Sequence, residues 1–194
     1  MPKSILIIQG HPDATTPHFC HALADAYADG ATGAGHAVRR IAVAELDFPL
    51  LRTRADWENG APPPAIAACQ EDIRWAEHIV FVFPLWLGDL PALLKGFLEQ
   101  ALRPGFALGK GPRGFSGGLL KGRSARIVVT MGMPALFYRW YFRAHSLKSF
   151  EHNILAFCGV RPVRDTVVGL VESGGEARHR QWLDKMRELG QRAV

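Results

Sequence analysis

Short apolar stretches alternate with helical stripes along the whole chain, and this alternation restricts the possible folds more than any other feature. A short apolar run between turn residues is typical of a strand that is buried on both faces. We predict strands at Ser4–Gln9, Ala37–Val43, His78–Phe83, Ala125–Thr130 and Val163–Val171. Ala37–Val43 is interrupted by Arg39 and Arg40, which suits the edge of a sheet better than its centre.

Helical spacing of apolar residues fills the intervals between these strands. The first helix begins near Phe19, and Gly30 with Gly33 indicates its end. Other helices are predicted at Pro64–Ala76, from Leu93 to Leu102, in part of Leu136–Phe157 and from Trp182 to Leu189. Strict β–α alternation predicts a parallel sheet with helices on both faces, and five strands fit the flavodoxin-like order 2-1-3-4-5. We expect one α/β domain, 1–194, because no repeat or linker divides the chain.

Two segments are too long to be plain connections, and long excursions in α/β domains often build substrate sites. They are Ala44–Pro63 and Arg103–Arg123. The second mixes glycine and proline with Lys110, Arg113, Lys121 and Arg123. A solvated loop and a cover over an anionic cofactor both fit that composition.

Composition and charge exclude several classes of protein. Hydrophobic residues make up 48% of the 194 residues and charged residues 21%, which is ordinary for a globular chain rather than a disordered one. The formal net charge of +5 permits an anionic small molecule, but the cations are scattered and accompany no nucleic-acid recognition motif. No apolar run is long enough for a signal peptide or an integral membrane segment. The three cysteines are far apart, which predicts reduced thiols and a cytoplasmic location.

Ligands of an open parallel sheet bind outside the carboxyl ends of its strands, so the predicted strand ends are candidate binding loops. The first strand ends in a turn that leads into a helix, where free backbone N–H groups favour a phosphate. Threonine hydroxyls and imidazole N–H groups add donors there, and the candidate residues are His11, Thr16, His18 and Phe19.

The third and fourth strand ends suit a planar ring. Pro84 bends the chain, and Leu85, Trp86 and Leu87 then offer a flat apolar shelf, although Trp86 also fits a packing role over the sheet end. The loop after the fourth strand contains Thr130, Met131, Gly132 and Met133; its glycine allows a close approach of backbone to ligand. A phosphate site beside two ring sites describes a flavin mononucleotide.

The stretches "ILIIQGHPD", "FPLWLGDLPALLKGFLEQALRPGFAL" and "LKGRSARIVVTMG" resemble the flavodoxin-like NAD(P)H:quinone oxidoreductases, a family that includes quinone reductase and the potassium-efflux ancillary proteins. The resemblance covers roughly residues 4–170. It implies a flavin, FMN or FAD, on the Pro84–Leu87 loop, with its phosphate near the first turn and the Thr130–Met133 loop lining its ring. It also implies that Tyr138 and His145 lie at the substrate face; from the residues alone, both would be helix-surface or core residues.

In such a protein the flavin carries the redox chemistry and the protein orients it. The resemblance implies hydride transfer from NAD(P)H to the flavin, followed by reduction of a quinone or similar small electron acceptor in the same place, which predicts ping-pong kinetics. It also implies a homodimer. The aromatic run Phe137–Phe142 fits either a dimer surface or packing within the chain.

Other patterns in the sequence bear on alternative functions. Gly114-Phe115-Ser116-Gly117-Gly118 matches the G-x-S-x-G pattern of hydrolases, but that motif needs a strand before it and a helix after it. The spacing from Gly105 to Lys110 is wrong for a Walker loop, and histidines and cysteines do not group at metal-ligand spacings, so we expect no metal. A flavin-binding regulatory subunit of a membrane ion-efflux system remains the alternative function, and a flavodoxin-type one-electron carrier is a third.

Overall fold

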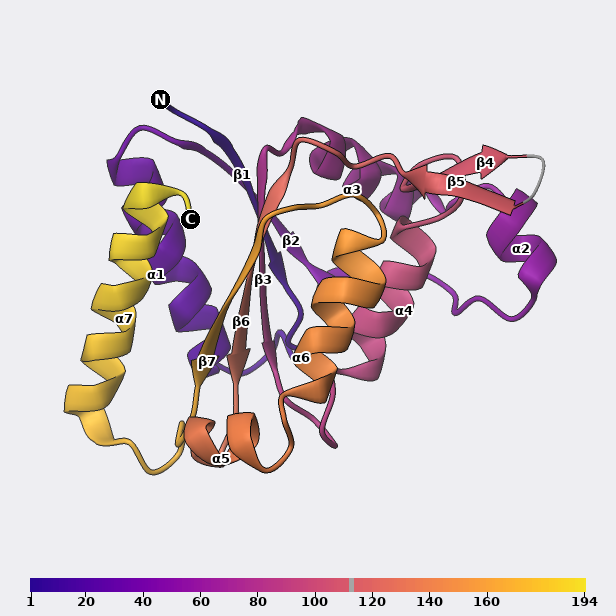
Figure 1. The fold of residues 1–194 in the computed structure, drawn as a ribbon. Coiled ribbons are helices and arrows are strands. Elements are labelled where there is room, and N and C mark those ends of the chain that lie inside the picture. Colours follow the sequence, from indigo (N-terminus) through magenta and orange to yellow (C-terminus); the bar gives the residue numbers. More distant parts are fainter. Residues whose placement is uncertain (112–113) are drawn as a thin grey trace.

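The computed structural model describes residues 1–111 and 114–194, and its centre is a five-stranded parallel sheet (Figure 1). The strand order is β2-β1-β3-β6-β7, and every neighbouring pair is parallel. Numbered along the chain, this order is 2-1-3-4-5, so the predicted flavodoxin-like sheet is confirmed. The strands are β1 (Ser4–Gln9), β2 (Ala37–Ala42), β3 (His78–Pro84), β6 (Ser124–Thr130) and β7 (Val163–Val168).

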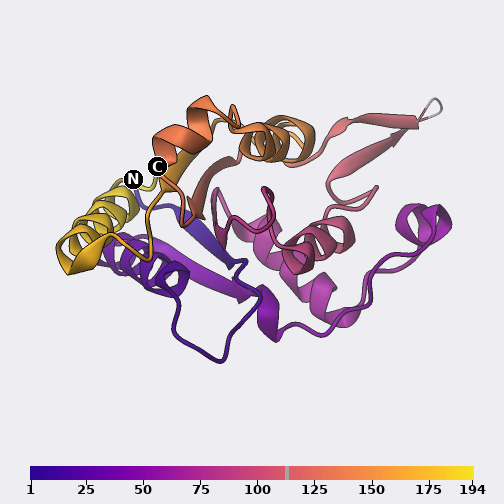
Figure 2. The same cartoon turned by 90° about the horizontal axis from the view of Figure 1, so that it is seen from below.

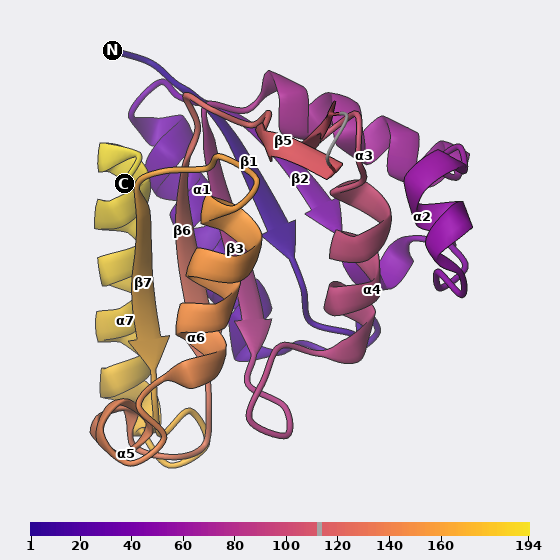
Figure 3. The same ribbon diagram turned by 45° about the vertical axis from the view of Figure 1, so that its right-hand side comes forward.

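Helices cover both faces of the sheet (Figures 1 and 3). One face carries α1 (Phe19–Gly33) and α7 (Gly175–Arg192). The other carries α3 (Pro64–Trp75), α4 (Ala92–Ala101) and α6 (His145–Ser149) with the π-helical segment η2 (Phe150–Ala156). The short helix α5 (Ala135–Trp140) lies at the carboxyl end of the strands (Figure 1). Within the described residues, no helix is both long and apolar enough to span a membrane.

Side-chain alternation along the strands divides the apolar interior into two cores, because successive residues of a strand point to opposite faces. Ile5 and Ile7 of β1 pack with α1 and α7. Leu6 and Ile8, which alternate with them, pack with α3, α4 and the π-helical segment. All four side chains are at most 1% exposed, which explains why the strand reads as a continuous apolar run.

The predicted element boundaries differ from the structure at the end of the last strand. β7 ends at Val168 rather than Val171, since the backbone of Leu170 takes a φ of +58° and leaves the sheet. The N–H groups of Leu170 and Val171 then donate to the carbonyl groups of Met133 and Met131. The prediction that the second strand lies at an edge is confirmed.

The two long segments contain structure that the sequence pattern did not predict. The first contains a 3₁₀ turn η1 (Val43–Glu45) and α2 (Arg54–Asn59). The second forms an antiparallel hairpin of β4 (Leu108–Gly111) and β5 (Gly114–Gly118), which projects away from the sheet beside α2 (Figures 1 and 2). The G-x-S-x-G stretch is therefore a hairpin strand and not a strand–turn–helix elbow.

Two of the loop cations bond to backbone carbonyl groups of this chain. Lys110 Nζ donates to the carbonyl oxygen of Glu58 at 2.8 Å, and the Arg123 guanidinium donates to the carbonyl oxygens of Ile73 and Arg74 at 3.1 and 2.8 Å. These contacts connect segments that are far apart in sequence. They indicate a structural role for Lys110 and Arg123, which neither the solvated loop nor the cofactor cover considered from the sequence includes, while Arg113 lies outside the described residues.

Helices α1 and α7 touch through two glycines. A Cβ atom at Gly30 would lie 2.1 Å from the carbonyl oxygen of Arg187, and one at Gly190 would lie 2.1 Å from the carbonyl oxygen of Tyr27. Because these neighbours are backbone atoms of a packed helix pair, they cannot move aside cheaply. Both positions therefore need glycine.

We expect Gly30→Ala to lower the free energy of unfolding by about 1–3 kcal/mol through overpacking. Gly33→Ala is the matched control, since a Cβ there meets nothing within 4 Å and the helix propensity of alanine favours it by about 0.5–1 kcal/mol. Urea denaturation followed by circular dichroism measures both. Equal effects of the two substitutions would contradict the proposed helix contact.

Candidate functional site

Backbone hydrogen bonds connect the segments that leave the carboxyl ends of the strands. Gly10 N–H donates to the carbonyl oxygen of Val82, and Leu85 N–H donates to that of Thr130, both at 2.8 Å. Met131 N–H donates to the carbonyl oxygen of Val168 at 2.9 Å. These bonds continue the sheet past the strand ends, so four loops start side by side at one edge, which faces the viewer in Figure 2.

A cleft of about 540 Å³ lies at this edge. Its volume falls within the range of about 300–1,000 Å³ that is usual for small-molecule sites. Nine of the twelve residues predicted to bind a cofactor line it: His11, His18, Phe19, Pro84, Leu85, Trp86, Thr130, Met131 and Gly132.

The carboxylate of Asp13 organises the turn after β1. It accepts hydrogen bonds from the backbone N–H of Thr15 at 2.7 Å and from the hydroxyl of Thr15 at 2.6 Å. It also contacts the hydroxyl of Thr16 and lies 2.8 Å from His18 Nε2. The hydrogen bonds from Thr15, Thr16 and His18 hold the pKa of Asp13 well below its usual range, so the carboxylate is ionised at neutral pH.

His11 lies under this turn, and its ring stacks on that of His18 with 3.7 Å between the ring centroids. The backbone N–H of Asp13 donates a hydrogen bond to His11 Nδ1 at 3.1 Å. Burial, followed by the charge of His18, lowers the pKa of His11. A neutral ring that accepts at Nδ1 carries its proton on Nε2.

The apolar shelf after β3 is held by a tight turn. The N–H and carbonyl groups of Trp86 and Asp89 bond to each other at 2.9 and 3.0 Å. Between them, Leu87 and Gly88 have φ values of +48° and +81°, as a two-residue type I′ turn requires. The indole of Trp86 is half exposed and lies edge-on to His11 with 6.0 Å between centroids. The turn thus presents a large aromatic surface beside the first loop.

Under the cleft, Cys20 Sγ lies 3.0 Å from the hydroxyl of Thr130. Burial raises the pKa of the Cys20 thiol to about 12. The thiol is therefore protonated at neutral pH and packs as a small apolar group, which excludes it as a ready nucleophile.

Sequence reasoning missed four residues of the lining, which are Asp13, Cys20, Val171 and Glu172. Asp13 belongs to the turn after the first strand, where the sequence pattern indicates hydroxyl and imidazole donors and gives no role to a carboxylate. Val171 and Glu172 follow the last strand, and the rule that ligands bind at strand ends is the signal that identifies them. Two of the four carry carboxylates, a kind of side chain that the predicted phosphate site does not include.

Three predicted cofactor residues do not line the cleft. The Thr16 hydroxyl lies 2.9 Å from His18 Nε2 and supports the first turn. Leu87 is fully exposed at the tip of the shelf turn, and Met133 packs against the larger core.

The two residues predicted at the substrate face also lie off the cleft lining. Tyr138 is only 2% exposed; its hydroxyl is 2.7 Å from Ser146 Oγ and accepts from the backbone N–H of Leu147 at 3.3 Å. With Leu85 it lines a small internal cavity. His145 is exposed at the start of α6. In this chain Tyr138 therefore joins α5 to α6, and the two side chains do not form a pair at the cleft.

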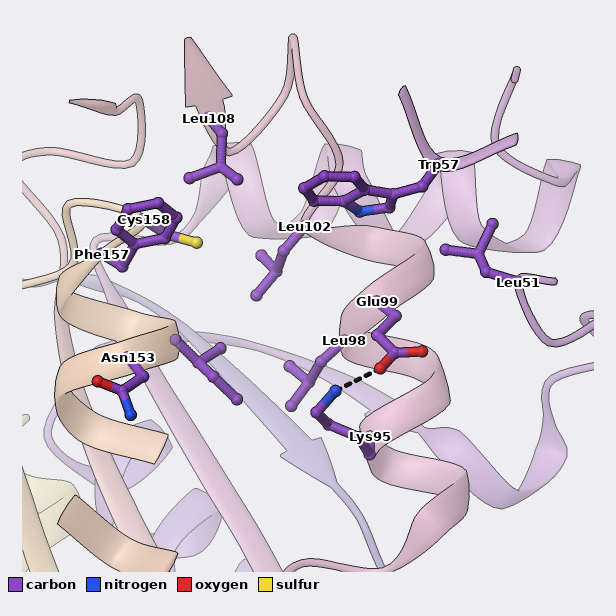
Figure 4. A pocket seen from close by; sticks show the side chains of 11 residues that line it. Leu51, Trp57, Lys95, Leu98, Glu99, Leu102, Leu108, Asn153, Phe157 and Cys158 are labelled. Atoms are coloured by element: carbon purple, nitrogen blue, oxygen red, sulfur yellow. Dashed lines mark hydrogen bonds and ion pairs between the residues drawn. The ribbon is translucent and has the colours of Figure 1, made fainter. Parts of the chain in front are cut away.

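A second cavity of about 400 Å³ lies between α4 and the π-helical segment (Figure 4). Trp57, Leu102 and Phe157 contribute apolar walls, with Leu108 of the hairpin above them. An ion pair of Lys95 and Glu99 lies at its side (Figure 4). The cavity is apolar and holds none of the predicted cofactor residues. Among the residues that the structure describes, no three His, Cys, Asp or Glu side chains group as metal ligands.

The sheet order and the cleft at its carboxyl edge define a flavodoxin-like protein. The family model Flavodoxin_2, described as a flavodoxin-like fold, matches residues 3–192, so the chain belongs to this family.

Several relatives are called oxidoreductases. An "Uncharacterized NAD(P)H oxidoreductase" of Haemophilus influenzae is 31% identical over 129 residues, which are 64% of this chain and 63% of that protein. This chain thus covers less than two thirds of that relative's length. An "FMN-dependent NADH:quinone oxidoreductase" of Nitratidesulfovibrio vulgaris is 27% identical over 211 residues, covering 96% and 97% of the two chains. An "NAD(P)H:quinone oxidoreductase from Methanothermobacter marburgensis" has a TM-score of 0.83 at 22% identity, covers 98% and 96%, and supports the fold.

Proposed function

We propose that this chain is a flavin-dependent oxidoreductase that transfers a hydride from NAD(P)H, through a bound flavin, to a quinone or similar small electrophile. The observation that carries the proposal is the cleft itself, where hydrogen-bond donors of the first turn and the Trp86 shelf meet at one edge of the sheet. The names of the relatives support the same activity.

The residues of the cleft fit a flavin nucleotide at its two ends. Indole faces stack on flat rings, and Trp86 and Leu85 supply such a surface. At the other end, the His18 imidazole and the first turn of α1 are donors of the kind that bind a phosphate, and the neighbouring threonine hydroxyls bond to Asp13 and His18 in this structure. When bound, the flavin supplies the redox chemistry, and the chain's residues orient it and exclude water. The relative named as FMN-dependent favours FMN over FAD.

Proton handling is assigned to the α5–α6 region. His145 is exposed at the start of α6, and an imidazole is a side chain that can act as a general acid or base. The Tyr138 hydroxyl bonds to the hydroxyl of Ser146 and accepts from the backbone N–H of Leu147, the two residues after His145. Tyr138 is therefore a positioning residue for that segment.

We also propose that the protein works as a homodimer in the cytoplasm. The aromatic run Phe137–Phe142 leaves large side chains in water, with Trp140 78% and Tyr141 64% exposed. The apolar cavity of Figure 4 is a second uncovered surface. Such surfaces favour an interface between chains. Three free, buried cysteines are consistent with a reducing compartment. A regulatory role in an ion-efflux system has no comparable observation in its favour.

The first test is the addition of FMN, FAD and riboflavin to purified protein, followed by absorption spectra and steady-state kinetics with NADH or NADPH and a soluble quinone. We expect retained yellow flavin and parallel double-reciprocal lines, because one site serves two substrates in turn. Protein that retains no flavin at millimolar supply would sink the proposal, and intersecting lines would remove the ping-pong scheme alone.

Trp86→Ala tests the ring site. We expect this substitution to weaken FMN binding by about 1–3 kcal/mol, because aromatic burial is lost. Trp75→Ala is the control: Ser4 Oγ, at the amino end of β1, donates to the Trp75 carbonyl, so Trp75 lies at the opposite edge of the sheet. Fluorescence titration measures both, and an unchanged constant for Trp86→Ala would place the ring elsewhere.

Trp140→Glu tests the dimer. Trp140 belongs to the aromatic run that the proposed interface buries, and a charge is costly in a buried apolar contact, so sedimentation velocity should show a shift from dimer to monomer. Gln191→Glu adds the same charge on an exposed position of α7 and should leave the dimer intact. A wild-type chain that sediments as a monomer at micromolar concentration would contradict the assembly.

A further inference from the structure

The donors expected to bind a phosphate in the first turn already bind a carboxylate of the chain. Asp13 Oδ1 accepts from the N–H and the hydroxyl of Thr15, and Asp13 Oδ2 contacts the Thr16 hydroxyl and His18 Nε2. These are backbone, hydroxyl and imidazole donors directly before a helix, which is the set that recognises phosphate oxygens.

The two anions cannot share these donors. Each hydroxyl has one hydrogen to donate, and a second negative group within a few ångströms of the first is repelled by it. Asp13 and His18 both line the cleft, so the carboxylate and one of its donors belong to residues that border the ligand space. The other carboxylate of the lining, Glu172, follows β7 and has no hydrogen bond to these donors among the described contacts.

We propose that Asp13 is a specificity-determining residue: its carboxylate competes with the phosphate of a flavin nucleotide for the donors of the first turn. This inference rests on the proposed flavin function. A phosphate gains these donors only by displacing Asp13. The affinity advantage of FMN over riboflavin, which lacks the phosphate, is therefore smaller than it would be if the donors were free. Asp13 thereby sets which flavin form the chain prefers.

The test compares FMN with riboflavin, which lacks the phosphate, on wild type, Asp13→Asn and Asp25→Asn. Asparagine keeps the size and one acceptor oxygen of Asp13 and removes the charge. We expect Asp13→Asn to bind FMN about tenfold more tightly, with the riboflavin constant unchanged, because one close repulsion is lost. Asp25→Asn changes the net charge equally but lies on α1 outside the cleft, paired with Arg40, and should have a far smaller effect.

Several results would overturn the inference. They are an unchanged or weaker FMN constant in Asp13→Asn, an equal gain for riboflavin, or an equal gain in Asp25→Asn. Loss of both flavins by Asp13→Asn with a native circular dichroism spectrum would overturn it too, since Asp13 would then build the turn for the ligand.

Inorganic phosphate separates this inference from the proposed function. At a fixed phosphate concentration, tighter binding raises the melting temperature more, so phosphate should stabilise Asp13→Asn more than wild type. If phosphate does so while neither protein binds any flavin, the flavin function fails and the competition for the donors stands. If flavins bind, but the FMN dissociation constant and the stabilisation by phosphate are the same in wild type and Asp13→Asn, only the role of Asp13 fails.

Discussion

The backbone hydrogen bonds between neighbouring strand ends are the interaction on which the site depends. The N–H of Leu85 donates to the carbonyl group of Thr130, and that of Met131 to the carbonyl group of Val168. The adjacent strand therefore sets the position and direction in which each loop begins. Side chains at those positions can then face one cleft although they are separated by dozens of residues in the sequence. The apolar cores on the two faces stabilise the sheet, and the loops at its carboxyl edge remain available for a ligand.

Burial explains which parts of the fold the sequence could predict. Strands such as Ser4–Gln9 are apolar on both faces, and the Arg39–Arg40 pair in the second strand indicated an edge. The hairpin of β4 and β5 had no such signal, because its glycine-rich stretch Leu108–Gly118 lacks an alternating pattern. The early end of β7 depends on bonds from Leu170 and Val171 to a distant loop, which no local pattern shows.

The same reasoning separates the predictable part of the candidate site from the rest. Residues at strand ends, such as His11, Trp86 and Thr130, reach the cleft because the topology places them there. Tyr138 differs, since its burial comes from contacts with Ser146 and Leu147 across a change of helix direction. The part played by Asp13 likewise depends on how a short loop folds back on itself, and many sequences of similar composition would bond otherwise.

The turn at Leu87 and Gly88 has a thermodynamic consequence for recognition. Its left-handed backbone is closed by two hydrogen bonds between Trp86 and Asp89 before any ligand arrives. The conformational entropy of the shelf is therefore lost during folding and not during association. A ligand that stacks there meets a rigid platform, and its affinity reflects contact and desolvation with little penalty for ordering the protein.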